Sequence, residues 1–178
     1  GAGKHEQRDV LGAIDFVADR YPESQIGLMG VSFGAAIVIL TANSSPRVVG
    51  VIADSSFSSI TDLISEEVSA RTSAPKWAAA ILKPGIIIVT KLFKGIDVTA
   101  VAPGQYVSDI GFPIGIIHCT EAERVPIYHG EQIRNNSPAG SQELFVDECD
   151  HAGAYDHDPT TYLNFVATYF DQRFQIKN

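Results

Sequence analysis

A chain of 178 residues can bury the core of one domain, and its 45% hydrophobic and 19% charged residues exclude an intrinsically disordered protein. The formal net charge of -8 at pH 7 argues against a nucleic-acid partner, because such a surface requires clustered lysine and arginine. The apolar stretch 77–93 is interrupted by Lys83, Pro84, Gly85 and Lys91, so no membrane span is expected. The N-terminal residues lack the apolar segment of a signal peptide, and we therefore expect a cytoplasmic protein.

Helices and strands are predicted to alternate along the whole chain, 1–178, as a single domain. In chain order the expected elements are a helix over 6–20, a strand over 26–29, a helix over 33–43, strands over 48–53 and 113–118, a helix over 126–135, a strand over 143–147 and a helix from 159. The strands are short apolar runs without polar alternation, which is typical of strands buried on both faces. The pattern predicts an α/β fold, with a parallel sheet of about four strands and helices on both faces.

The long connection 60–105 is predicted to be a helical excursion between the second and third strands. Pro84 and Gly85 interrupt it, and Pro103 and Gly104 close it. It is long for a simple crossover, so we expect either a wall over the site or an ordinary packing layer.

The turn after the first strand carries a motif with chemical meaning. The chain there reads Gly30-Val31-Ser32-Phe33-Gly34, a G-x-S-x-G sequence. Between a strand and a helix this motif predicts a nucleophile elbow, which exposes the serine hydroxyl above the sheet edge. Gly30 and Gly34 are expected to allow the tight turn, and the following helix to aim its positive end at a developing oxyanion. The alternative is a glycine-rich turn with a solvated serine.

A serine hydroxyl needs a neighbouring base to become a nucleophile. His151 follows the fourth predicted strand, so it is expected at the same sheet edge as Ser32. His157 is the rival base, but it lies against the cap of the last helix. The other histidines are not expected to carry chemistry: His118 as a packed, hydrogen-bonded residue, His5 and His129 as helix or surface residues.

Four segments of the chain resemble the α/β-hydrolase fold, in its esterase and serine-peptidase-like branch. They are 26–36 around Ser32, 48–60, 113–126, and the loop of His151 with the helix 158–170. The resemblance covers nearly the whole chain but indicates little about the substrate. It implies that Ser32 is the nucleophile, that His151 is the base, and that the backbone N–H of Phe33 is one oxyanion donor. It implies no cofactor and no metal.

The acid that should orient the histidine is the first departure from this family. Family members usually carry H-G-x-x-D-x-x-V-P after the third of these strands, and the aspartate position of that motif holds Ala122 here. Alanine cannot orient an imidazole. Glu121 and Glu123 flank this position, and Asp54 at the end of the second strand can also face the histidine. A fourth possibility is that no acid serves and that activity is weak.

The second departure is the missing upstream part of the sheet. The full fold has further strands before the elbow, and an upstream loop supplies the second oxyanion donor. The strand before Ser32 would therefore have an uncovered edge, which is a pairing hazard. The chain is then a fragment, a homodimer paired edge to edge, or one of two chains that complete a sheet. We favour a homodimer or a partner chain.

Two cysteines, Cys119 and Cys149, are too few for a disulfide scaffold, and no Cys/His spacing resembles a zinc site. They follow the third and fourth strands, which should be neighbours, so we expect the two side chains to lie close together. In a cytoplasmic setting they are expected to be free thiols.

These observations predict a serine hydrolase that cleaves an ester, thioester or amide of a small acyl substrate through an acyl-enzyme. The competing prediction is a truncated α/β-hydrolase with weak or no activity that acts as a binding or interaction module. Ala122 and the missing upstream loop favour that alternative, whereas Ser32 and His151 oppose it. A nucleotide-binding α/β domain is disfavoured, because the chain has no G-x-G-x-x-G and no Walker A lysine.

Overall fold

The computed structural model describes residues 3–64, 66, 81, 84–85 and 101–174. The elements follow one another as α1 (Lys4–Arg20), β1 (Ile26–Val31), α2 (Phe33–Thr41), η1 (Ala42–Ser44), β2 (Val48–Asp54), α5 (Pro103–Tyr106), η3 (Val107–Asp109), β3 (Gly115–Cys119), α6 (Ile127–Asn136), β4 (Gln142–Val146), α7 (Ala154–His157) and α8 (Pro159–Phe174). Most of the excursion predicted over 60–105 lies outside the described residues, and so does most of the stretch 77–93. Within the described part of the chain, no helix is long and apolar enough to cross a membrane.

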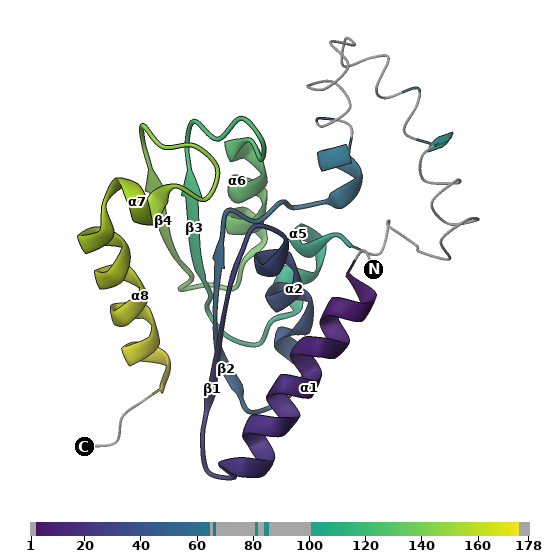
Figure 1. The fold of residues 1–178 in the computed structure, drawn as a ribbon, viewed down its shortest axis with the longest axis vertical. Helices are drawn as coiled ribbons and strands as arrows, with labels where there is room; N and C mark the ends of the chain where they lie inside the picture. The colour runs from purple at the N-terminus through teal and green to yellow at the C-terminus, as the bar shows by residue number, and fades with distance from the viewer. Residues whose placement is uncertain (1–2, 65, 67–80, 82–83, 86–100, 175–178) are drawn as a thin grey trace.

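The strands form one four-stranded parallel sheet in the order β1-β2-β3-β4. Helices α1, α2 and α6 cover one face of this sheet, and α8 covers the other (Figure 1). This arrangement confirms the predicted α/β class and the predicted parallel sheet. Because all four strands run in one direction, the turns after them meet at a single edge, where sites in such folds are built.

The apolar runs of the sequence are explained by a core on each side of the sheet. Val51 and Ile116 belong to the cluster beneath α1 and α2, while their chain neighbours Ile52 and Ile117 belong to the cluster beneath α8. Successive side chains in a strand point to opposite faces, so a strand covered on both sides must be apolar at every position.

Helix α8 begins and packs as its sequence predicts. The carboxylate of Asp158 accepts hydrogen bonds from the backbone N–H groups of Thr160 and Thr161, at 3.1 and 3.0 Å, which caps the first turn. The apolar stripe of the helix faces the sheet, and its members there are Tyr162, Phe165, Val166, Tyr169 and Phe170. Tyr169 is fully buried, and its hydroxyl accepts from the Val51 N–H at 2.9 Å and donates to the Pro113 carbonyl at 2.8 Å.

Strand β1 pairs with β2 on one side only among the described strands. Its residues Met29 and Val31 are 39% and 45% exposed, although both are apolar. The strand that carries the elbow is therefore an edge strand of the described sheet.

The prediction of two free thiols is wrong, because Cys119 and Cys149 form a disulfide. The prediction that they lie close together is correct. Residue Cys119 is in register with Val146, the last residue of β4, and the turn after β4 brings Cys149 back toward β3. The resulting Cα–Cα distance of 5.3 Å lies within the range that a disulfide requires.

Candidate active site

The turn between β1 and α2 has the backbone geometry of an elbow. Ser32 has a φ of 55° and a ψ of -118°, a conformation that a non-glycine residue adopts only under strain. Its backbone N–H donates to the carbonyl of Asp54 at 2.8 Å, which ties the turn to the end of β2. Its own carbonyl accepts from the N–H of Ala35 at 3.1 Å and so begins the helix.

The two glycines of the motif have different roles. A Cβ atom on Gly30 would lie 2.4 Å from the backbone of Gly34, so Gly30 is required by the close approach of strand and helix. A Cβ atom on Gly34 would meet nothing within 4 Å. Its backbone also does not have the positive φ that favours glycine. The role predicted for Gly30 is therefore supported, and the one predicted for Gly34 is not.

The structure brings His151 and Ser32 together across 119 positions of sequence. The Nε2 atom of His151 lies 2.8 Å from the Ser32 hydroxyl oxygen. His151 stands in the turn between β4 and α7, so both side chains come from turns at the same edge of the sheet. His157, the rival base, is exposed at the end of α7.

No carboxylate orients the imidazole in the described part of the chain. Nδ1 of His151 is buried and has no hydrogen-bond partner there. The residues Glu121 and Glu123 are both exposed. Ala122 is 4% exposed and packs in the apolar cluster that includes Cys149. For Nε2 to accept the serine proton, Nδ1 must carry a hydrogen, and leaving such a buried donor unpaired costs about 1–3 kcal/mol.

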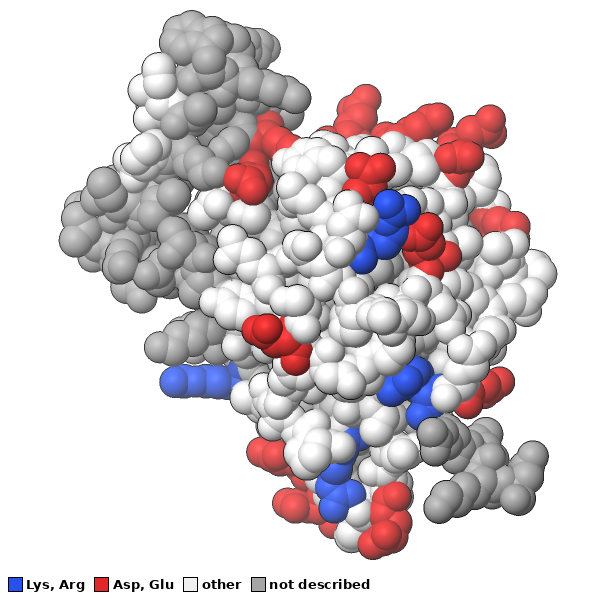
Figure 2. Space-filling model, turned by 180° about the vertical axis from the view of Figure 1, so that it is seen from behind, with Lys and Arg blue, Asp and Glu red and all other residues white. Residues whose placement is uncertain are grey.

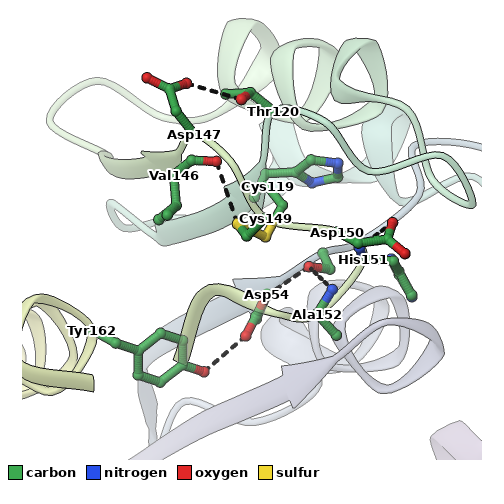
Figure 3. The surroundings of a disulfide bond; sticks show 12 residues. Asp54, Cys119, Thr120, Val146, Asp147, Cys149, Asp150, His151, Ala152 and Tyr162 are labelled. Carbon is green, nitrogen blue, oxygen red and sulfur yellow. Dashed lines mark hydrogen bonds between the residues drawn. A yellow bond between two sulfur atoms is a disulfide. The ribbon is translucent and has the colours of Figure 1, made fainter. Parts of the chain in front are cut away.

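Asp54, the last residue of β2, is a buried carboxylate at 2% exposure. Figure 3 shows it between the turn of His151 and the ring of Tyr162. It accepts hydrogen bonds from the hydroxyls of Tyr162 and Ser55, each at 2.8 Å. Burial raises the pKa of Asp54 despite these two donors. The carboxylate is thus held by other partners, and it acts on the His151 ring by its charge.

Burial is the main cause that lowers the pKa of His151 below its ordinary value, and the positive charge of Arg124 lowers it further. The negative charges of Asp150 and Asp54 oppose this shift. At neutral pH the imidazole is therefore uncharged, which is the form that can accept a proton.

The backbone N–H of Phe33, the predicted oxyanion donor, lies next to Ser32 at the N-terminus of α2. Phe33 is the first residue of α2, and the first N–H groups of a helix have no partner within it. The positive end of the helix dipole adds to the same effect. No second donor can be assigned from the described residues.

Sequence reasoning missed a second buried serine–histidine pair. His129, expected in a helix or at the surface, lies in α6 with 0% exposure. Its Nδ1 lies 2.8 Å from the hydroxyl of Ser58 and accepts from the Ser58 backbone N–H at 3.2 Å, while its Nε2 lies 3.0 Å from Glu66. Ser58 is 3% exposed, so this network fastens the start of the excursion to α6 rather than facing a substrate. Gly130 and Ile133 of α6 are buried together with His129. This burial results from tertiary packing, and no pattern in the sequence indicated it.

His118 is buried, as predicted, and its Nε2 lies 2.9 Å from the carbonyl of Val125.

A cavity of about 270 Å³ lies between β4 and α8, and its lining does not include Ser32 or His151. Among the described residues, no group of histidine, cysteine and acidic side chains could hold a metal ion. Lysine and arginine are scattered singly among acidic side chains on the face shown in Figure 2, rather than gathered in a basic patch.

Comparison with solved structures decides the fold. An esterase of Pyrococcus furiosus superposes on 97% of this chain with a TM-score of 0.73 at 20% sequence identity. The esterase domain of a Rhodothermus marinus protein covers 97% with a TM-score of 0.67 at 16% identity. The chain has the α/β-hydrolase fold. An acylaminoacyl peptidase of Pyrococcus horikoshii also matches 97% of the chain, with a TM-score of 0.67 at 14% identity.

The match covers only part of these hydrolases. The chain spans 63% of the Pyrococcus furiosus esterase, 70% of the Rhodothermus marinus domain and 28% of the peptidase. No protein-family model matches the sequence, and no curated protein matches it either.

Proposed function

We propose that this chain is a serine hydrolase that cleaves an ester, thioester or amide of a small acyl substrate through an acyl-enzyme. The observation that carries the proposal is the 2.8 Å contact between His151 Nε2 and the Ser32 hydroxyl, on a strained turn at the start of a helix. The esterases and the peptidase with the same fold support hydrolysis as the reaction class.

The geometry supports the following sequence of steps. Neutral His151 accepts the proton of Ser32 as its oxygen attacks the substrate carbonyl. The oxyanion that forms receives the N–H of Phe33 and the positive end of α2. The imidazolium returns its proton to the leaving group, and a water then hydrolyses the acyl-enzyme by the same route.

The proposed mechanism has no carboxylate bonded to the His151 ring among the described residues. Asp54 and Asp150 stabilise the imidazolium by charge alone, because Nδ1 has no hydrogen-bond partner among the described residues. Glu121 and Glu123 can serve only if their turn moves, since both are exposed. We therefore expect a functional but slow hydrolase, because losing an oriented acid lowers kcat by about 10⁴.

Labelling with a fluorophosphonate probe tests the proposal. The folded protein should be labelled on Ser32, and Ser32→Ala and His151→Gln should each abolish the label. Ser108→Ala is the matched control, since Ser108 is exposed in η3. A folded protein that takes up no label would contradict the enzymatic function.

The alternative is a catalytically weak or inactive module that binds a partner. The unpartnered Nδ1 of His151 and the alanine at position 122 favour it. In that case the protein folds, Ser32 resists the probe, and acyl substrates are not turned over.

We also propose that a second copy or another chain pairs with the edge of β1, because β1 pairs only with β2 among the described strands and its Met29 and Val31 are exposed. A cytoplasmic location stays a prediction. The Cys119–Cys149 disulfide weighs against it, because such bonds are typical of oxidising compartments. A free-thiol count on protein isolated with its thiols trapped would decide between the two.

A further inference from the structure

We propose that the Cys119–Cys149 disulfide holds His151 where it can accept the proton of Ser32. Reduction of this bond would then switch the hydrolase to a slower state. The inference rests on the proposed serine hydrolase function and adds a redox dependence to the same site.

The disulfide joins the loop of His151 to the middle of the sheet. Cys149 lies two residues before His151 in the turn after β4, and Cys119 is the last residue of β3 (Figure 3). Cys119 is fully buried in the cluster beneath α8, where its strand is paired on both sides. The bond therefore fastens the turn to the end of an interior strand of the sheet.

The turn that carries His151 needs such a restraint, because its backbone is strained on both sides of the histidine. Glu148 has a φ of 56° and Ala152 has a φ of 62°, and neither is a glycine. Each such conformation costs on the order of 1–3 kcal/mol and persists only where the surroundings impose it. A covalent link between these two positions, at Cys149, is well placed to impose it.

The other restraints on this turn are weaker. Asp150 accepts from the N–H groups of His151 and Glu123, at 2.6 and 3.2 Å, but its side chain is exposed to competing water. The N–H of Ala152 donates to the Ser55 hydroxyl at 3.1 Å. The imidazole itself has no partner at Nδ1 among the described residues. Where an acid normally orients the ring, the orientation here depends on the backbone of the turn.

Reduction is chemically simple and leaves the sheet in place. A dithiol such as dithiothreitol attacks Cys149, which is 7% exposed whereas Cys119 is fully buried. The dithiol becomes a cyclic disulfide, and the two electrons and two protons it gives up convert Cys119 and Cys149 to thiols. The backbone pairing of β3 is unaffected, so the expected change is confined to the turn of His151.

The test compares the rate of fluorophosphonate labelling of Ser32 before and after reduction. We expect the maximal labelling rate to fall about 10- to 100-fold on reduction, because a 1 Å misplacement of a catalytic group can cost 10²-fold. The probe concentration for half-maximal rate should not change, since both cysteines are buried in the cluster beneath α8. Reoxidation should restore the rate, and circular dichroism should show the same secondary structure in both states.

The double variant Cys119→Ala/Cys149→Ala is the matched control. It should be labelled at the rate of the reduced protein, whether or not dithiothreitol is present. Equal rates for the oxidised and reduced wild-type protein would overturn the inference while leaving the hydrolase function intact. No labelling in the oxidised protein would instead contradict the function.

An NMR titration of the His151 ring gives a second readout that does not depend on activity. In the oxidised protein, burial and the charge of Arg124 lower the pKa of His151 from its ordinary value, against the charges of Asp150 and Asp54. A turn freed by reduction exposes the ring, so the pKa should rise toward its ordinary value. An unchanged pKa on reduction would contradict the positioning role.

Discussion

At the scale of single residues, the candidate site is a base without its usual acid. His151 reaches Ser32 at 2.8 Å, yet nothing in the described part of the chain bonds its other ring nitrogen. Burial keeps the ring neutral, so that Nε2 is free to accept a proton at neutral pH. The same burial disfavours the imidazolium that forms when the proton is accepted. The charge balance around this one side chain should therefore control both the rate and its pH dependence.

The rate should rise with pH through a midpoint below the ordinary histidine pKa, because the pKa of His151 is lowered and only the neutral ring can act as base. Removing a positive charge favours the imidazolium, so Arg124→Gln should move this midpoint upward, toward the ordinary histidine value. Profiles of kcat/KM between pH 5 and 8 measure the shift. Arg20→Gln, at the end of α1, should leave the midpoint in place. A wild-type midpoint above the ordinary histidine pKa would contradict this account.

The substitution Ala122→Asp should raise kcat by about 10- to 10³-fold, if the carboxylate reaches the unpartnered Nδ1 of His151. It should also raise the pKa of His151, since an adjacent negative charge favours the imidazolium. Ala122→Asn is the control of nearly equal volume. It should not give this gain, because an amide neither carries the charge nor fixes the required tautomer. Equal kcat values for the Asp and Asn variants would contradict the claim that the site lacks an acid which a carboxylate at position 122 can supply.

At the scale of elements, two contacts decide how the helices meet the sheet. The elbow requires the start of α2 to approach β1 at Gly30. On the other face, the buried hydroxyl of Tyr169 in α8 satisfies the N–H of Val51. The ladder between β2 and β3 begins at Ile52, so the tyrosine supplies the hydrogen bond that β3 does not.

The substitution Gly30→Ala should destabilise the fold by about 3 kcal/mol or more, because its methyl group would lie 2.4 Å from backbone atoms of Gly34 that cannot move aside. Gly34→Ala is the matched control. Its methyl group meets nothing within 4 Å, and alanine favours the helix, so its stability should change by about 1 kcal/mol or less. Urea unfolding of the two variants measures the difference, and equal losses would contradict the argument.

The variant Tyr169→Phe should lose about 1–3 kcal/mol of unfolding free energy, because it leaves the buried N–H of Val51 without an acceptor. Tyr155→Phe in α7 removes a hydroxyl from a side chain that is 47% exposed, and should change stability by about 0.5 kcal/mol or less. Thermal or urea unfolding distinguishes the two. A loss of the same size in both variants would show that burial of the hydroxyl is not the cause.

At the scale of the whole molecule, β1 is an edge strand of the sheet that the described residues form. Parallel sheets are normally covered on both faces and protected at their edges, whereas Met29 and Val31 are exposed here. The hydrolases of the same fold are longer than this chain, which spans 63% of the Pyrococcus furiosus esterase. Self-association through this strand is the simplest way for the isolated chain to cover it.

The isolated chain should therefore sediment as a dimer at micromolar concentration. Met29→Lys should shift it toward monomer, because a charged side chain at the strand edge opposes pairing. Leu163→Lys, on the exposed face of α8, should leave the assembly unchanged. A wild-type chain that is monomeric at this concentration would contradict edge pairing between copies.

Local pattern was sufficient for most of this fold. The apolar runs predicted the four strands of the described sheet, and their parallel direction followed from the helices expected between them. The G-x-S-x-G turn and the histidine after β4 could be found for the same reason, since each follows directly from a strand end. Helix α7 was not predicted, because a single turn of four residues has no periodicity to detect.

What the tertiary structure alone decided is pairing between distant groups. The free thiols predicted for Cys119 and Cys149 are a disulfide, because strand register and a tight turn bring their backbones within bonding range. The sequence also offered three carboxylates for His151 without ranking them. Folding exposes Glu121 and Glu123 and surrounds Asp54 with hydroxyl donors. Composition and spacing determine which elements form, whereas burial and side-chain direction determine which polar groups meet, and these exist only once the layers have packed.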